Sequence, residues 1–466
     1  MRSVNRRSFM KGSTLATAAL AMGGCNSTSV QFPCVMPVKP RFRKPEEKLN
    51  IGVVGVGGKG WSNWEPMFNM GENIVALCDV DQGALEKGLN HVKGRCPDVK
   101  GYSDYRKMLD ASTNLDAVLV STPDHTHAPA AIRAMKKGCH VYVEKPLVRT
   151  IWDARYFELV AKTNGVVTQM GNQGSAADGM RRSIEILHAG VLGTVKEVHV
   201  WTNRPIWPQG IPRPEGADPV PESLNWDAWL GTAPERPFKN GVYHNFKWRG
   251  FFDFGTGAFG DMACHTMNLP FRGLKLGKVT NAVCMKIDGT STDTYPSKSM
   301  VKLTYAARQN MPAVNLFWYD GNLKPSEAIM PQVIATLGAV PNTGCLLIGD
   351  KGMLVSTNDY GADSYVGFTG DQRMKAIFKG DTFKDVAETI PRCKRGHHGE
   401  FVDACKGIGS CYSDVNHSIP MLEAMLVGCI AQRVPGELAW NSGAMTFNNP
   451  AADAFVKPFI RPGWEY

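Results

Sequence analysis

The chain carries three side chains whose types and positions suit chemistry at a hydroxyl group. Lys145 comes directly after an apolar run that ends in Glu144, and its ammonium group can stabilise negative charge developing on an oxygen. Asp261 and His265 are four residues apart, so on a helix they lie on one face. Imidazole is the side chain best suited to take a proton near neutral pH, and a carboxylate one turn away can orient it or hold a substrate.

These side chains also have ordinary structural interpretations. Lys145 could form a surface salt bridge with Glu144, and Asp261 with His265 could be a solvated pair on a helix face. The segment before Asp261, from Gly255 to Gly260, is rich in glycine, which lets the backbone approach a ligand closely. The glycines therefore favour a binding site, and the position of Lys145 at a strand end favours function in the same way.

An alternation of strands and helices begins at Leu49. Strands are expected at 50–54, 73–79, 116–122, 140–144 and 166–170. Helices are expected at 61–70, 82–93, 104–110, 128–137 and 151–163. Apolar strands separated by helices predict an α/β domain whose parallel sheet has helices on both faces. Ligands bind at the carboxyl ends of such strands, and Lys145 lies at one of these ends.

The first strand is followed by the dinucleotide fingerprint Gly55-x-Gly57-x-x-Gly60, with Gly58 inside it. These glycines allow a tight turn and a close backbone approach to a pyrophosphate at the next helix N-terminus. Asp79 ends the second strand, where a carboxylate accepts hydrogen bonds from ribose hydroxyls, and Asp81 could share this role. A carboxylate repels a 2′-phosphate, so we expect NAD rather than NADP. A glycine turn that serves only the fold is the alternative, and the strand–loop–helix context disfavours it.

Polar residues at the ends of two later strands extend the predicted cofactor site. Thr122, Pro123, His125 and His127 follow the strand at 116–122 and are expected to line the nicotinamide end. Either histidine could instead cap the helix expected from residue 128. Glu144 and Lys145 end the next strand and are predicted as cofactor contacts as well.

The pattern changes after Asn172. Strands are expected at 193–202, 282–287, 299–306 and 313–319, and helices at 400–405 and 420–433. They predict an α+β domain with a large, open and mostly antiparallel sheet, a kind that often pairs with its own copy, so we expect a homo-oligomer. A chain of 466 residues exceeds one core. We therefore divide it into a dinucleotide-binding domain at 49–171 and a substrate-binding and oligomerisation domain at 172–466.

Residues 1–34 have the features of an export signal. Arg6 and Arg7, followed by Phe9 and Lys11, precede a weakly apolar stretch, which is typical of the Tat route and of periplasmic delivery. A basic tail is the alternative. Cys25 follows a poor lipobox, so lipid anchoring at Cys25 and simple cleavage or retention of the signal both stay open. Residues 35–48 are predicted to be a linker.

Composition excludes several classes of function. The net charge of +9 is spread along the chain without a run of five basic residues, so no nucleic-acid partner is expected. No apolar run approaches the roughly twenty residues that span a bilayer, so contact with a membrane is expected only through Cys25. The 12 cysteines include no C-x-x-C pair, so we expect neither a disulfide framework nor a metal site.

Together these motifs resemble the Gfo/Idh/MocA oxidoreductases, the glucose–fructose oxidoreductase and inositol dehydrogenase family. The matching features are the glycine loop, Asp79, Thr122-Pro123-Asp124-His125-Thr126-His127, Glu144-Lys145-Pro146 and Gly260-Asp261-x-x-x-His265. The resemblance implies an N-terminal Rossmann domain that binds NAD and a C-terminal domain with a large open sheet. It implies a catalytic trio of Lys145, Asp261 and His265. In that family His265 would take the hydroxyl proton as a hydride passes to nicotinamide.

Other residues are predicted to complete the site. Asn172 and Gln173, close to where the family binds substrate, are predicted as cofactor contacts. Tyr243, Trp248 and Arg249 are predicted as substrate contacts, together with the trio, because aromatic faces and hydrogen-bonding groups suit sugar rings. A buried interface uses the same residue types, so that alternative stays open.

Three functions follow in order of preference. The first is an NAD-dependent dehydrogenase acting on a secondary hydroxyl of a sugar, polyol or glycoside. The second is an NAD-dependent glycoside hydrolase or lyase of the same superfamily, which oxidises a ring carbon, eliminates the aglycone and restores the hydroxyl without net redox change. An exported protein cannot easily regenerate free NAD, which favours the hydrolase or lyase. The retained Glu144-Lys145-Pro146 favours the dehydrogenase, because the α-N-acetylgalactosaminidase branch usually has another residue in place of Lys145. The third is a non-catalytic binding protein, which the intact trio disfavours.

Overall fold

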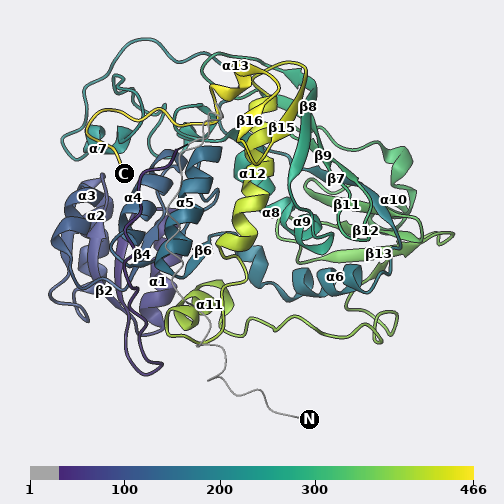
Figure 1. The fold of residues 1–466 in the computed structure, drawn as a ribbon, viewed down its shortest axis with the longest axis horizontal. Helices are drawn as coiled ribbons and strands as arrows, with labels where there is room; N and C mark the ends of the chain where they lie inside the picture. Colours follow the sequence, from purple (N-terminus) through teal and green to yellow (C-terminus); the bar gives the residue numbers. More distant parts are fainter. Residues whose placement is uncertain (1–30) are drawn as a thin grey trace, which may run out of the picture. The chain divides into compact units, whose positions relative to one another are not determined.

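The N-terminal half forms a parallel sheet of six strands in the order β3-β2-β1-β4-β5-β6 in the computed structural model (Figure 1). The structure describes residues 31–466, so residues 1–30 of the predicted Tat signal, with Cys25, lie outside the described residues. The strands are β1 (Asn50–Val54), β2 (Asn73–Cys78), β3 (Lys100–Tyr102), β4 (Ala117–Val120), β5 (His140–Val143) and β6 (Thr168–Met170). All four residues of β4 and of β5 are buried, as expected for strands that have helices on both faces.

Five helices connect these strands: α1 (Lys59–Asn69), α2 (Gln82–Val92), α3 (Tyr105–Ala111), α4 (Asp124–Met135) and α5 (Ile151–Asn164). Strand order reverses between β1 and β4, and the loops that follow these two strands flank the crevice where open α/β sheets bind ligands. Helix α4 begins four residues before the predicted start at 128. Pro123 is its N-cap and the acidic Asp124 lies in its first turn, which suits the positive end of the helix dipole.

The second half contains a sheet of ten strands in the order β14-β13-β12-β11-β7-β10-β9-β8-β15-β16. The longer strands are β7 (Val195–Trp201), β8 (Val279–Asp288), β9 (Lys298–Tyr305), β10 (Val314–Tyr319), β11 (Gly344–Gly349), β12 (Gly352–Ser356), β13 (Ser364–Phe368) and β15 (Glu437–Asn441). β14 (Lys375–Ala376) and β16 (Thr446–Phe447) are short edge pieces. β7 pairs with β10 in parallel and with β11 antiparallel. The pairs β9–β10, β8–β9, β11–β12 and β12–β13 are also antiparallel, which confirms the predicted, mostly antiparallel sheet.

Helices from the second half cover this sheet and join it to the first. They are α6 (Asp178–His188), α7 (Trp226–Leu230), α8 (Gly257–Thr266), α9 (Asn268–Gly273), α10 (Pro331–Leu337), α11 (Gly396–Cys405), α12 (Val415–Ala431) and α13 (Pro450–Asp453). Helix α12 packs against α5 on one side and against α8 and β8 on the other (Figure 1). It is buried almost all round, so it fixes the helix that carries Asp261 and His265 relative to the first sheet.

Two segments lie differently from a simple division at residue 172. Phe401 and Val402 of α11 belong to the same apolar core as Ile51 and Val53 of β1. The predicted linker at 35–48 has no regular helix or strand, but it is bound to the first domain: Arg43 Nε donates to Asp116 Oδ2 at 2.9 Å. Among the described residues, no helix is both long and apolar enough to cross a membrane.

Candidate active site

A single cavity of about 700 Å³ connects the glycine loop to helix α8. Its wall includes Gly55, Gly57 and Gly58 at one end, and Lys145, Asp261 and His265 at the other. The structure therefore brings the predicted cofactor loop and the predicted catalytic trio to one continuous space. The cavity is larger than one sugar ring requires, which suits a dinucleotide with a small substrate beside it.

The glycine loop has the geometry that close approach to a pyrophosphate requires. A Cβ atom added at Gly60 would lie 1.9 Å from the carbonyl oxygen of Gly55, so this tight turn admits only glycine. Gly58 has a φ of 51° and is the N-cap of α1, with no atom within 4 Å of the space where a Cβ would be. The loop thus leaves open space at a helix N-terminus, where backbone N–H groups attract a phosphate.

Asp79 lies at the cavity wall, at the end of β2, and already holds the loop in place. Its Oδ2 accepts hydrogen bonds from the backbone N–H groups of Val56 at 2.8 Å and Gly57 at 3.0 Å, and its Oδ1 accepts one from Asp81 at 3.0 Å. Burial raises the pKa of Asp79, against the lowering effect of these three donors. Oδ1 keeps one lone pair for a ribose hydroxyl, so the side chain fits the predicted contact to NAD.

The ammonium group of Lys145 is bound to Asp261 rather than to Glu144. Its Nζ donates to Asp261 Oδ1 at 2.8 Å and to the Asp261 backbone oxygen at 3.2 Å. Arg249 Nε donates to the same Oδ1 at 3.2 Å. The side chains of Lys145 and Asp261 are 15% and 8% exposed, so this ion pair lies inside the cavity wall and not on the surface. Two cations therefore share one carboxylate where the two halves of the chain meet.

Lys145 and Asp261 stabilise each other's charge, whereas the like charge of Arg249 acts to lower the pKa of Lys145. Burial alone would lower the pKa of Lys145, but the Asp261 carboxylate raises it above its ordinary value. Burial alone would raise the pKa of Asp261, but Lys145 and Arg249 lower it. Lys145 is therefore a full cation near neutral pH and can bind a substrate oxygen.

His265 is a neutral imidazole at the same wall. Burial, helped by the positive charge of Lys145, lowers its pKa to about 3. Its Nδ1 is buried without a hydrogen-bond partner. Helix α8 carries Asp261 and His265 in successive turns, as the spacing of four residues predicts. A neutral imidazole beside a lysine can accept a proton from a hydroxyl group that the lysine holds.

Glu144 also lines the cavity and is fixed from three directions. Its Oε1 accepts hydrogen bonds from Asn63 Nδ2 at 2.9 Å and Gln173 Nε2 at 3.2 Å, and Lys59 Nζ lies 3.8 Å away. These contacts tie β5 to α1 and to the start of the second half of the chain. They hold the backbone that carries Lys145.

The structure places the other predicted residues in two groups. Thr122, Pro123, Gln173 and Trp248 line the cavity. Those that do not line it are Gly60, whose contact with Gly55 closes the glycine loop, and His125, His127, Asn172 and Tyr243.

The residues of the second group support the site from behind. His125 Nε2 lies 2.9 Å from the Trp229 carbonyl oxygen, and the two ring nitrogens of His127 lie 2.8 Å from the carbonyl oxygens of Pro146 and Thr122. Asn172 is fully buried, and its Nδ2 donates to the Cys264 carbonyl oxygen of α8. Tyr243 is only 2% exposed and packs in an aromatic core with Trp226 and Phe254. Polar and aromatic side chains of these types also suit a ligand site, and it is their burial that assigns them a structural role here.

Sequence reasoning missed several residues of the cavity wall. They include Arg204, Asp359 and Tyr360, which come from loops of the second half of the chain. Tyr360 lies in the loop between β12 and β13, and no motif surrounds it. Its position depends on the pairing of distant strands, so no signal in the sequence could have found it.

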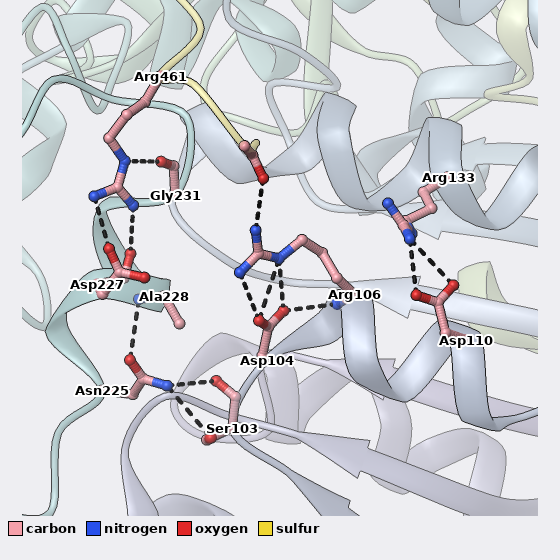
Figure 2. Close-up of polar contacts among 11 residues, drawn as sticks. Ser103, Asp104, Arg106, Asp110, Arg133, Asn225, Asp227, Ala228, Gly231 and Arg461 are labelled. Carbon is pink, nitrogen blue, oxygen red and sulfur yellow. Dashed lines mark hydrogen bonds and ion pairs between the residues drawn. The ribbon is translucent and has the colours of Figure 1, made fainter. Parts of the chain in front are cut away.

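A segment around α7 crosses the Asp79 end of the cavity. The backbone N–H of Asn225 donates to the Val80 carbonyl oxygen at 2.8 Å. The side-chain amide of Asn225 lies 3.3 Å from Ser103 Oγ (Figure 2). The segment contributes Ala228 and Trp229 to the cavity wall.

The C-terminal segment holds α7 in this position. Arg461 Nε donates to the Gly231 carbonyl oxygen at 2.9 Å, and its Nη1 lies 2.7 Å from Asp227 Oδ1 (Figure 2). Arg106 of α3 donates to the Gly463 carbonyl oxygen at 2.8 Å, and its guanidinium carbon lies 3.4 Å from the centre of the Trp464 ring. We call α7 and residues 461–464 the strap, because α7 lines one end of the cavity and residues 461–464 hold α7 there.

Two family models match the chain in succession. The first, described as an oxidoreductase family with an NAD-binding Rossmann fold, matches residues 49–172, and the second, its C-terminal alpha/beta domain, matches residues 194–311. The chain belongs to the Gfo/Idh/MocA oxidoreductase family. Its N-terminal domain is the family's NAD-binding Rossmann domain, so the cofactor is NAD.

Curated relatives match only part of this oxidoreductase. An α-N-acetylgalactosaminidase from Shewanella oneidensis is 32% identical over 165 residues, which are 32% of this chain and 35% of the relative. A glycosyl hydrolase family 109 protein from Shewanella sp. (strain ANA-3) is 33% identical over the same shares of both chains. The alignments span about a third of the length of these relatives.

Solved structures of similar fold cover most of the chain. The WlbA dehydrogenase from Bordetella pertussis, in complex with NADH and UDP-GlcNAcA, matches with a TM-score of 0.58 and 16% identity over 85% of this chain and 99% of its own. An inositol dehydrogenase homolog from Azotobacter vinelandii, in complex with NADH and myo-inositol, matches with a TM-score of 0.59 and 16% identity over 87% of this chain and 100% of its own. At this identity the likeness concerns the fold.

Proposed function

We propose that this Gfo/Idh/MocA protein transfers a hydride between a secondary hydroxyl of a sugar, polyol or glycoside and the nicotinamide of NAD. One observation carries the proposal. A neutral His265 lies on the wall of the cavity that also holds the Lys145–Asp261 pair, and this cavity continues to the glycine loop. The structural neighbours named above were solved with sugar or polyol ligands, which supports this substrate class.

The residues divide the chemical work. Lys145, held by Asp261, donates a hydrogen bond to the substrate oxygen and stabilises its developing negative charge. His265 accepts the hydroxyl proton as the carbonyl bond forms. NAD, when bound, accepts the hydride that leaves the carbon. Asp261 keeps Lys145 charged and in place, and Arg249 binds the same carboxylate.

A second candidate is a redox-neutral glycoside hydrolase or lyase that keeps its NAD. The partial similarity to α-N-acetylgalactosaminidase and to glycosyl hydrolase family 109 proteins favours it. The strap also supports it, because a covered cofactor suits a reaction that restores its own oxidant. A dehydrogenase needs a cation at the substrate oxygen, so the ion pair of Lys145 with Asp261 favours the dehydrogenase. The same ion pair disfavours a non-catalytic binding protein.

One experiment separates these functions. Purified protein is analysed for bound NAD by mass spectrometry, and is then given a panel of sugars, polyols and nitrophenyl glycosides. The first candidate predicts reduced nicotinamide with at least one sugar or polyol. Release of an aglycone without net reduced nicotinamide would establish the second candidate, and neither signal with any compound would support a binding protein.

We propose further that the chain is exported by the Tat route to the periplasm, with or without a lipid at Cys25, and that it forms a homo-oligomer through its open sheet. The support is the twin arginine in residues 1–34 and the size of the second sheet. Fractionation of cells that express the full chain, compared with an Arg6→Lys and Arg7→Lys variant, tests the route. Light scattering of the purified protein tests the oligomer.

A further inference from the structure

Tyr360 faces the proton acceptor of the proposed reaction. Its ring lies edge-on to the His265 imidazole, with the ring centres 5.2 Å apart and an angle of 90° between the planes. Tyr360 lines the cavity and is 46% exposed, so a ligand in the cavity can reach it. Besides burial, the charges of Asp359, Lys145 and Glu144 act on its phenol group, so the hydroxyl lies in the field of Asp359 and of the catalytic cluster.

The loop that carries Tyr360 is fixed by its own hydrogen bonds. Asn358 Oδ1 accepts from the backbone N–H groups of Tyr360 at 2.9 Å and Ala362 at 3.2 Å. Its amide nitrogen donates to Asp363 Oδ2 at 2.8 Å. Asn358 therefore closes the turn around the tyrosine, which limits the positions that the ring can take.

Two glycines let this loop press against the start of the second domain. A Cβ at Gly174 would lie 2.6 Å from the Tyr360 carbonyl oxygen, and a Cβ at Gly179 would lie 1.7 Å from the Ala362 carbonyl oxygen. Such approaches admit only glycine at 174 and 179. A half-exposed tyrosine held this firmly at a cavity wall is better explained by ligand contact than by packing, since packing would bury its ring.

The two side chains have complementary hydrogen-bonding roles near neutral pH. His265 is neutral because burial, with the charge of Lys145, lowers its pKa to about 3, so it offers an acceptor. Partial burial raises the pKa of Tyr360, so its phenol keeps its proton and offers a donor. An acceptor and a donor on neighbouring side chains match two neighbouring oxygens of one ligand.

We propose that Tyr360 and His265 together recognise a vicinal diol. His265 accepts the proton of the hydroxyl that is oxidised, and the Tyr360 hydroxyl donates a hydrogen bond to the oxygen on the adjacent carbon. The C–H and O–H bonds of the first carbon break, its carbonyl bond forms, the hydride goes to nicotinamide and the proton to the imidazole. This inference rests on the proposed function and narrows its substrate class to compounds with adjacent hydroxyls.

The test compares a diol with its deoxy analogue in two forms of the enzyme. The best sugar of the panel and its analogue without the adjacent hydroxyl are given to NAD-loaded wild type and to Tyr360→Phe. A neutral hydrogen bond contributes roughly 1 kcal/mol, so removing the adjacent hydroxyl should lower kcat/KM of the wild type roughly three- to tenfold. The same removal should change kcat/KM of Tyr360→Phe by less than about twofold, because the partner hydroxyl is already gone. Tyr365→Phe, a change on β13 away from the cavity wall, serves as the matched control and should behave as wild type.

Separate outcomes refute the inference and the proposed function. An equal loss on deoxygenation in wild type and Tyr360→Phe would overturn the diol contact while leaving the dehydrogenase intact. If the wild type reduces no NAD with any sugar, the proposed function fails. The comparison is then made on the dissociation constants of myo-inositol and a deoxyinositol for the NAD-loaded protein, where equal affinities, or no binding, would overturn the diol contact as well.

Discussion

Replacing Lys145 with methionine removes the charge at the centre of the site and keeps most of the side-chain volume. In the structure its ammonium group donates to Asp261 Oδ1 at 2.8 Å, and Arg249 Nε lies 3.2 Å from the same oxygen. The variant therefore leaves the Asp261 carboxylate with one cation, Arg249, instead of two. NAD should stay bound, because the glycine loop and Asp79 lie at the other end of the cavity.

The expected loss of activity follows from the role of Lys145 at the substrate oxygen. Removing one preorganised donor from a site where charge develops costs roughly 10²- to 10³-fold in kcat. Breaking a buried ion pair by removing one partner costs about 3–5 kcal/mol in stability. Arg249 still faces Asp261, and Lys145 is 15% exposed, so we expect a loss in the free energy of unfolding below about 3 kcal/mol.

The pH profile separates this electrostatic effect from a structural one. His265 accepts a proton only when neutral, so activity is full above its pKa and is lost below it. With a pKa of about 3, protonation of His265 should not limit the wild type between about pH 5 and 8. Lys145 is one of the causes that lower this pKa. In Lys145→Met the acid limb of kcat/KM should therefore move upward toward the ordinary histidine value.

The assay is kcat/KM of the purified variants from about pH 8 down to about pH 3, where the acid limb of the wild type is expected, with bound NAD measured in parallel. Lys145→Arg keeps the positive charge and should keep the acid limb of the wild type, even where its activity is lower. Lys162→Met removes a surface lysine paired with Glu158 and should change neither quantity. Activity of Lys145→Met within about threefold of wild type, or an unmoved acid limb, would refute this reasoning.

Three further predictions concern the cofactor and stability. Asp79→Asn replaces one carboxylate oxygen by an NH2 group, so either the two loop N–H groups at Oδ2 or the Asp81 N–H and the ribose hydroxyl at Oδ1 lose their acceptor. NAD affinity should therefore fall roughly tenfold or more by calorimetry, whereas exposed Asp98→Asn should not change it. Arg106→Ala removes a contact that holds the strap, so NAD should dissociate several-fold faster in a stopped-flow displacement assay. An unchanged dissociation rate would contradict the role of the strap. The control is Arg133→Ala, because the ion pair of Arg133 with exposed Asp110 lies away from the strap (Figure 2). Burial lowers the pKa of histidines such as His125 and His397 to about 3, so below about pH 6.5 the unfolded chain binds more protons than the folded chain. The free energy of unfolding measured in urea should therefore fall on acidification. A free energy of unfolding that stays constant down to about pH 4 would contradict this prediction.

Much of the fold could be predicted because its patterns are local. Buried strands such as β4 and β5 are short apolar runs, and the glycine loop follows β1 directly, so sequence order alone places Lys145 at the ligand edge of the sheet. The spacing of Asp261 and His265 fixes their common helix face. These features depend on neighbours in the sequence, which a single chain records.

The remaining features depend on contacts between distant segments. Tyr360 reaches the site only because β12 and β13 pair and their loop packs against Gly174 and Gly179. Helix α11 lies in the core of the first domain although it follows most of the second. His127 and Tyr243 have side chains that suit a ligand, but the tertiary packing turns them toward backbone carbonyls or an aromatic core. Residue type alone does not distinguish these environments.

The most direct test of the account follows deuterium from substrate to cofactor. A sugar or polyol from the panel, deuterated at its hydroxyl-bearing carbons, is mixed with NAD-loaded protein for a single turnover, and the nicotinamide is analysed by mass spectrometry. Hydride transfer at this site should give reduced nicotinamide that carries one deuterium, formed far more slowly in Lys145→Met than in wild type. Nicotinamide without deuterium, while the sugar is consumed, would contradict net hydride transfer from the sugar to NAD.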